Sequence, residues 1–109
     1  MPADLPAVDV VTASGPTPLV DVREDAEWAA GHAPAARHLP LSDLLARLDE
    51  LPTDGPVNII CRVGGRSAQA VAYLRQQGYD VRNVDGGMLA WEAAGLPVEV
   101  DGGAPGHVL

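Results

Sequence analysis

The chain has 109 residues, of which 47% are hydrophobic and 20% charged, and this is enough for one domain with a buried core and too short for two. Fifteen acidic residues against seven basic ones, all arginine, give a net charge of -8. This balance disfavours binding to nucleic acid or to an anionic membrane. The single cysteine excludes an internal disulfide, so the fold has to rest on its core.

The N-terminal residues MPADLPAVDVV contain neither a basic segment nor an apolar run of signal-peptide length. No apolar stretch in the sequence approaches the roughly 18 residues of a membrane-spanning helix. We therefore expect a cytoplasmic protein that binds no membrane and no nucleic acid. We further expect a monomer with a single domain over residues 1–109 and a core over about 5–100.

Four short apolar runs predict β-strands. Two of them, LVDV at 19–22 and VNII at 57–60, follow turn-forming residues and are typical of buried strands. A third run is VRNV at 81–84, and a weaker candidate is VDVV at 8–11. Four strands are therefore expected, and the first of them rests on the weaker signal.

Helical spacing separates these runs. Leucines at 41, 44, 45, 48 and 51 form a narrow apolar stripe that predicts a helix over 41–51. The other predicted helices cover 25–30, 67–77, which Gly78 ends, and 88–94, which Gly95 and Pro97 end.

Together these elements predict an α/β domain with a central, mainly parallel β-sheet and helices on both faces. The strand at 57–60, the helix at 67–77 and the strand at 81–84 form a βαβ unit, whose parallel strands require a crossover. Ligands of such sheets bind beyond the carboxyl ends of the strands, which points to the loop at 61–66. Residues 101–109 are poor in apolar residues and are predicted to form a flexible tail.

This loop places Cys61 between a buried strand and a helix. Gly64 and Gly65 permit positive φ angles, so that backbone N–H groups can converge on one point, where the helix N-terminus adds partial positive charge. Arg62 and Arg66 add two full charges. A free cysteine is ordinarily an inert core thiol, but this setting should lower the pKa of the thiol and make it a nucleophile at neutral pH.

Three motifs follow one another along residues 19–97. They are DVR at 21–23 with EW at 27–28 and GH at 31–32, then CRVGGRS at 61–67, and then DGG at 85–87 with Trp91, Gly95 and Pro97. The middle motif is similar to the active-site pattern C-x-x-G-x-R-S of the rhodanese (sulfurtransferase) family, and the outer two are similar to its terminal signatures. In this order the three motifs resemble the small, single-domain members of that family.

The resemblance implies a sulfurtransferase in which Cys61 carries sulfur as a persulfide. The thiolate would take the outer sulfur of thiosulfate or of a persulfide donor and pass it to cyanide or a thiol, with a sulfur-relay protein as a possible partner. No cofactor and no metal would be needed. A charged residue directly after the cysteine resembles the thiosulfate-using members. The residues that we expect to bind the substrate are Arg62, Val63, Gly64, Gly65, Arg66 and Ser67.

Two other functions stay open. Cysteine phosphatases and arsenate reductases use a similar loop with a wider spacing, whereas here four residues separate Cys61 from Arg66, and the position that would need an arginine is Ser67. Alternatively, the domain could be a non-catalytic binding or regulatory module of the rhodanese type. Such modules often lack the cysteine that this chain retains.

The remaining polar and aromatic residues have structural explanations. Asp21 and Arg23 flank a predicted strand end, and we expect them to form a structural ion pair, because buried charges are tolerated mainly in pairs. Trp28 and Trp91 are expected to anchor the core. His32 is expected to brace a turn, since the histidines lack the close spacing of zinc ligands.

Overall fold

The computed structural model describes residues 5–109, in which five strands alternate with five helical segments. The strands are β1 (Ala7–Val8), β2 (Leu19–Asp21), β3 (Arg37–His38), β4 (Val57–Ile60) and β5 (Val81–Val84). The helices are α1 (Val10–Ala13), α2 (Asp25–Ala30), the 3-10 helix η1 (Leu41–Glu50), α3 (Gly65–Gln76) and α4 (Gly87–Ala93).

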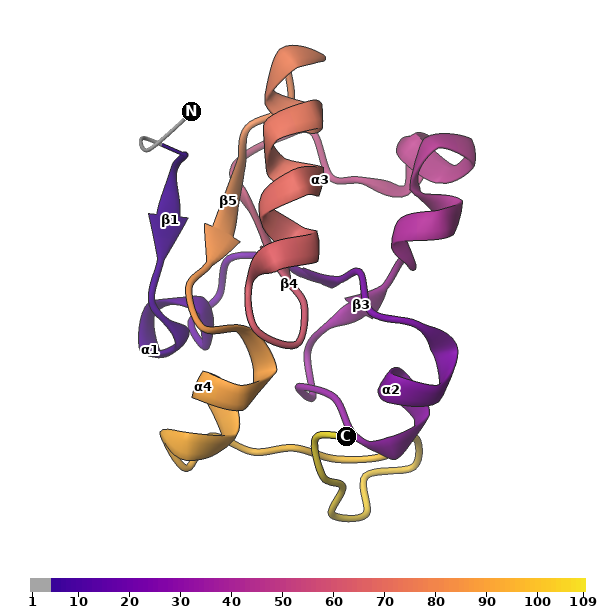
Figure 1. Ribbon diagram of the computed structural model, residues 1–109, viewed down its shortest axis with the longest axis vertical. Helices are drawn as coiled ribbons and strands as arrows, with labels where there is room; N and C mark the ends of the chain where they lie inside the picture. Colours follow the sequence, from indigo (N-terminus) through magenta and orange to yellow (C-terminus); the bar gives the residue numbers. More distant parts are fainter. Residues whose placement is uncertain (1–4) are drawn as a thin grey trace.

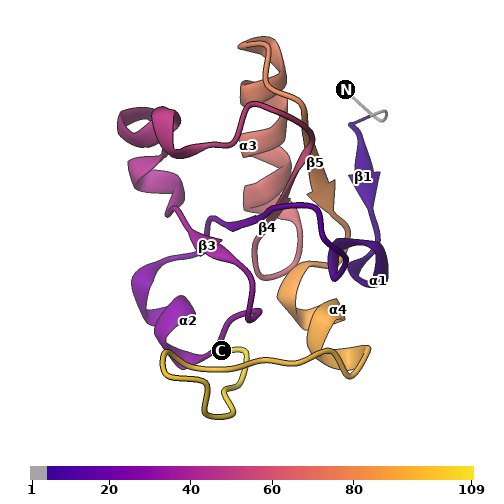
Figure 2. The ribbon, with the colours of Figure 1, turned by 180° about the vertical axis from the view of Figure 1, so that it is seen from behind.

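The five strands form one sheet in the order β1-β5-β4-β2-β3, and every neighbouring pair is parallel. The central strand β4 pairs with β2 on one side and with β5 on the other. Helix α3 crosses in front of this centre in Figure 1 and behind it in Figure 2. The prediction of an α/β domain with a parallel sheet is confirmed.

Helices cover both faces of the sheet. Side chains along β4 point alternately to one face and to the other, so both faces carry apolar residues that a helix has to bury. Ile59 packs with Leu74 of α3 in one core cluster, to which η1 also contributes. Ile60 packs on the opposite face with Met88 and Trp91 of α4, next to residues of α1. The two apolar clusters therefore hold β4 in the middle of the molecule.

The predicted N-terminal strand is wrong in part. The strand ends at Val8, and residues 10–13 form α1 instead. The reason is Asp9, whose side chain accepts a hydrogen bond from the backbone N–H of Thr12 at 2.8 Å and so caps a new helix. The two-residue strand β3 is absent from the sequence-based prediction, because so short a segment shows no periodicity.

The leucine stripe forms a 3-10 helix with a kink at Arg47, not a regular α-helix. Leu44 is buried, whereas Leu45 is 65% exposed. A 3-10 helix has three residues per turn, so Leu45 falls outside the face that Leu41 and Leu44 share. The remaining helices lie where the spacing predicts them: α2 has the predicted bounds, and α3 and α4 each begin one or two residues early.

The C-terminal segment lies along α2 and α4 (Figure 1). The backbone N–H of His107 donates to the carbonyl oxygen of Ala30 at 3.0 Å, and that of Gly106 donates to Val98 at 2.9 Å. Composition could not reveal these contacts, and the flexibility of residues 101–109 stays a prediction. In the part of the chain that the structure describes, no helix has the length and apolar character needed to cross a membrane.

Candidate active site

Cys61 directly follows β4, at the carboxyl end of the sheet, and its side chain is buried. The loop that follows turns at Gly64, whose φ of 108° lies in the left-handed region. The backbone N–H of Gly64 donates to Cys61 Sγ at 3.1 Å, and the hydroxyl of Ser67 lies 3.2 Å from the same sulfur. The expectation of a positive φ at Gly65 is wrong, because Gly65 is already the first residue of α3.

These donors favour the thiolate form of Cys61. Burial of the thiol raises its pKa. Hydrogen bonds from the Ser67 hydroxyl and from the backbone N–H groups of Ser67, Gly64 and Val63 lower the pKa by more than burial raises it, so the pKa lies below its ordinary value. The predicted activation of the thiol therefore agrees with the geometry. A hydroxyl and convergent amides supply it, and among residues 5–109 no histidine or carboxylate bonds the sulfur.

Helix α4 supports the loop from the other side. The backbone N–H groups of Met88 and Leu89 donate to the carbonyl oxygens of Cys61 at 2.8 Å and Arg62 at 3.0 Å. This close approach requires a glycine at position 87, since a Cβ there would lie 2.5 Å from both of these carbonyl oxygens. The DGG motif thus fixes the position of the cysteine through the backbone.

Arg66, predicted to bind substrate, is engaged by another side chain. Its guanidinium forms a two-pronged ion pair with the carboxylate of Glu27 in α2, at 2.6 and 2.8 Å. This pair lowers the pKa of Glu27 to about 2, against an ordinary value of 4.5, although burial raises it in part. Arg66 therefore joins α3 to α2 beside the loop.

Replacing Glu27 with glutamine is expected to destabilise the fold by about 1–2 kcal/mol at neutral pH. Because the folded-state pKa is depressed, the stabilisation is complete above pH 4.5 and is lost as the pH falls through about 2. Urea unfolding of both proteins across this range measures the difference. Asp49→Asn, at an exposed carboxylate of η1, is the control. A difference that does not change with pH would contradict the assignment.

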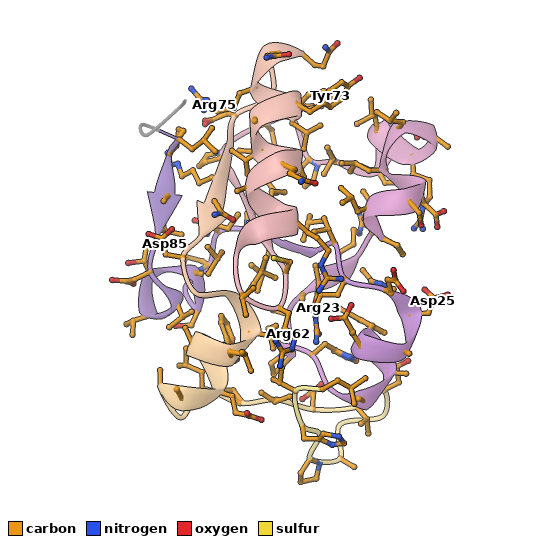
Figure 3. The ribbon with its side chains drawn as sticks, viewed as in Figure 1. Arg23, Asp25, Arg62, Tyr73, Arg75 and Asp85 are labelled. Carbon is orange, nitrogen blue, oxygen red and sulfur yellow. The ribbon has the colours of Figure 1, made fainter. Side chains whose placement is uncertain are left out.

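Arg62 and Val63 lie on the outer side of the loop. Arg62 Nε donates to the carbonyl oxygen of Leu109 at 2.7 Å, and Figure 3 shows its side chain between the loop and the C-terminal segment. Val63 is 55% exposed. Of the predicted substrate residues, Gly64 and Ser67 therefore contact the sulfur, Arg62 and Val63 line its surroundings, and Arg66 is held by Glu27.

A buried ion pair positions α2 relative to the loop. Both nitrogens on one edge of Arg23 donate to the carboxylate of Asp21 at 2.8–3.0 Å, and the two side chains are fully buried. The same guanidinium donates to the carbonyl oxygens of Glu27 at 3.3 Å and Gly31 at 2.8 Å, which lie in and after α2. The expected structural role of this pair is confirmed.

The aromatic residues divide into two groups. Trp91 is buried and its indole N–H donates to the carbonyl oxygen of Pro97 at 2.9 Å, as expected for a core anchor. Trp28 is only partly buried and belongs to neither core cluster, so the expectation that it anchors the core is wrong. It stacks with His32 and with His38, at ring-centroid distances of 3.6 and 4.7 Å. His32 also bonds through Nδ1 to the carbonyl oxygen of Trp28 at 2.9 Å, so it braces this turn as predicted.

Sequence reasoning missed two site residues, Glu27 as the partner of Arg66 and Asn83 as the partner of Ser67. Asn83 Oδ1 lies 2.5 Å from the Ser67 hydroxyl oxygen. A usable signal for Asn83 was its place in a buried strand, where a polar side chain needs a hydrogen-bonding partner. No comparable signal marks Glu27, which is far from Arg66 in sequence.

A family model for the rhodanese-like domain matches residues 8–94, which is most of the chain and includes the entire loop. The chain belongs to the rhodanese family. A relative from Allochromatium vinosum, named "Sulfurtransferase", is 51% identical over 81 residues, covering 73% of this chain and 76% of its own.

Two further matches show the range of this rhodanese family. The crystal structure of a rhodanese-like domain protein from Staphylococcus aureus has a TM-score of 0.80 and 32% identity, and the match covers 89% of this chain and 99% of that one. The HTH-type transcriptional regulator Rv0324 of Mycobacterium tuberculosis is 43% identical over 97 residues. That match covers 86% of this chain but only 42% of the regulator, so the region similar to this chain is one part of a longer protein.

Proposed function

We propose that this protein is a sulfurtransferase that moves sulfane sulfur from thiosulfate or a persulfide donor to cyanide or a thiol through a persulfide on Cys61. The observation that carries the proposal is the convergence of the Gly64 N–H and the Ser67 hydroxyl on the sulfur of Cys61, at 3.1 and 3.2 Å. The "Sulfurtransferase" relative, 51% identical, supports the same reaction class.

In the first step, the Cys61 thiolate attacks the outer sulfur of thiosulfate. A new S–S bond forms, the S–S bond of thiosulfate breaks, and sulfite leaves with the bonding electron pair. In the second step, cyanide attacks the terminal sulfur of the persulfide, thiocyanate leaves, and the thiolate is restored. In each step one anion attacks a sulfur atom and another anion leaves, so preorganised N–H and O–H donors stabilise both steps without a proton transfer from a general base.

Arg62 is the residue that we expect to attract an anionic donor. The side chain of Arg62 is exposed beside the loop. Within residues 5–109, its one hydrogen bond runs from Nε to the backbone carbonyl oxygen of Leu109. Arg66, by contrast, is neutralised by Glu27 at hydrogen-bonding distance. The charge that distinguishes thiosulfate from a neutral donor therefore comes mainly from Arg62.

Replacing Arg62 with alanine is expected to raise the KM for thiosulfate about tenfold and to change kcat much less, because the charge binds the ground state and transition state alike. Steady-state kinetics with cyanide as the acceptor measure both constants. Arg75→Ala is the matched control, since Arg75 is also exposed but lies at the far end of α3 (Figure 3). Equal KM values for wild type and Arg62→Ala would refute this role.

The proposed function is tested by the intact mass of the reduced protein after incubation with thiosulfate, before and after addition of cyanide. We expect a gain of one sulfur atom that cyanide removes. No gain of mass with thiosulfate, but a gain with a persulfide donor, would show that the protein is a sulfurtransferase with a donor other than thiosulfate. No gain with either would reject the sulfurtransferase.

The regulator from Mycobacterium tuberculosis favours a second candidate, a binding or regulatory module. In that function the domain would recognise a partner without passing sulfur on. Failure of Cys61 to accept sulfur from any donor, together with retained binding of a partner, would support this function over the first.

A further inference from the structure

Ser67 has one hydroxyl hydrogen and three acceptors within reach. Asn83 Oδ1 lies 2.5 Å from the hydroxyl oxygen, Cys61 Sγ lies 3.2 Å away, and the carbonyl oxygen of Gly64 lies 3.3 Å away. A serine hydroxyl donates a single strong hydrogen bond at a time. The three acceptors therefore compete, and the bond to the sulfur is not made in every state of the site.

The orientation of Asn83 favours this competition. Val81 faces α3 in the first core cluster and Val84 faces α4 in the second, so Asn83 points to the α3 side, where Cys61 and Ser67 lie. Its amide nitrogen donates to the carbonyl oxygen of Gly64 at 3.3 Å, which leaves Oδ1 facing the hydroxyl. Asn83 is 8% exposed, so little water is available to replace a lost partner.

Two arrangements of the hydroxyl hydrogen follow. While Cys61 is a neutral thiol, its S–H can donate to the Ser67 oxygen and the Ser67 hydroxyl donates to Asn83. When Cys61 ionises, the anion is the stronger acceptor and the hydroxyl turns to the sulfur. Asn83 Oδ1 then loses its donor in a buried site, and this loss opposes ionisation.

We propose that Asn83 is a positioning residue that controls the reactivity of Cys61, because its carbonyl oxygen competes with the sulfur for the hydroxyl hydrogen of Ser67. The effect on reactivity has two parts. A lower thiol pKa increases the fraction of thiolate but makes each thiolate less nucleophilic, so a thiol reacts fastest when its pKa is near the ambient pH. Asn83 thus limits how far the donors of the loop lower the pKa of the thiol.

Rotation of the Ser67 hydroxyl does not change the charged groups around Cys61. Arg66 of α3 faces the thiolate and is paired with Glu27 of α2, Arg62 lies next to the cysteine in the loop, and Asp85 follows β5 on the surface. The proposal therefore concerns a hydrogen-bond acceptor and not a charge. It holds for the thiol whether or not the persulfide reaction is the function.

The test is the pH dependence of alkylation of Cys61 by iodoacetamide, with the ultraviolet absorbance of the thiolate as a second readout. In Asn83→Ala the hydroxyl is free to bond the sulfur, so we expect a thiolate fraction up to about tenfold higher below the wild-type midpoint. In Ser67→Ala the midpoint should rise. In Asn83→Asp it should also rise, because a carboxylate holds the hydroxyl more strongly and repels the thiolate.

A double variant separates competition from a general change of the site. If Asn83 acts through Ser67, Asn83→Ala has no effect on the midpoint in a Ser67→Ala background. Asn58→Ala is the matched control, since Asn58 is a buried asparagine of β4 that points to the opposite face of the sheet. The proposal is overturned if Asn83→Ala leaves the midpoint unchanged or raises it, or if its effect persists without Ser67. Should Asn83→Ala not fold, a midpoint in Asn83→Asp at or below that of the wild type overturns it instead.

Discussion

Replacing Cys61 with serine is expected to lower sulfur transfer by several orders of magnitude, because an alcohol at this position ionises far too weakly to accept sulfur. The fold should survive, since a hydroxyl is close in volume to a thiol and can use the same donors from Gly64 and Ser67. Steady-state transfer to cyanide and intact mass after thiosulfate treatment measure the loss.

Thermal unfolding of the same variant serves as the control for folding. A melting temperature close to that of the wild type, with no gain of sulfur, would assign the chemistry to the thiol alone. Retained transfer in the serine variant would contradict the persulfide mechanism. Transfer at a reduced rate in Ser67→Ala would be compatible with that mechanism, because Ser67 donates a hydrogen bond to the sulfur of Cys61 and does not itself carry the transferred sulfur.

Replacing Asp21 with alanine is expected to destabilise the fold by about 3–5 kcal/mol, because it leaves the guanidinium of Arg23 charged and unpaired in the interior. Both side chains are fully buried, and the carboxylate accepts bonds from the backbone and side chain of Arg23. Urea unfolding measures the change in the free energy of unfolding. Glu50→Ala, which breaks a partly exposed surface pair with Arg47, should cost much less.

This substitution is also expected to weaken the site. Arg23 donates to the carbonyl oxygens of Glu27 and Gly31, so a shift of its guanidinium would also move α2. The Glu27 carboxylate, which binds Arg66, would move with that helix. A loss of stability below about 1 kcal/mol would show that water or another acceptor replaces Asp21. The buried pair would then not be the element that positions α2.

The elements predicted best are those whose ends are marked clearly in the sequence. The strands at 57–60 and 81–84 and the helix α2 have their predicted bounds, because β-branched runs and glycine or proline boundaries act locally. The prediction was wrong in two places. Asp9 caps α1 where the pattern predicts a strand. The leucine stripe forms a 3-10 helix with a kink at Arg47, which the spacing of the leucines does not reveal.

The candidate site divides in the same way. Cys61, Gly64 and Ser67 lie within seven residues of one another, so the loop pattern was sufficient to bring them together. Glu27 reaches Arg66 across 39 positions and Asn83 reaches Ser67 across 16, and these contacts depend on how α2 and β5 pack beside α3. Spacing along the chain carries no information on such pairs.

The sequence by itself determined the class of fold, the family resemblance and the choice of Cys61 as the candidate nucleophile, because backbone preferences, side-chain periodicity and a short loop are properties of neighbouring residues. Only the tertiary structure decided which charges remain free and which acceptors surround the sulfur. It paired Arg66 with Glu27, placed the C-terminal segment against Arg62 and set Asn83 beside Ser67. The physical reason is that hydrogen bonds and ion pairs depend on distances in space, and these are set by the packing of the whole domain.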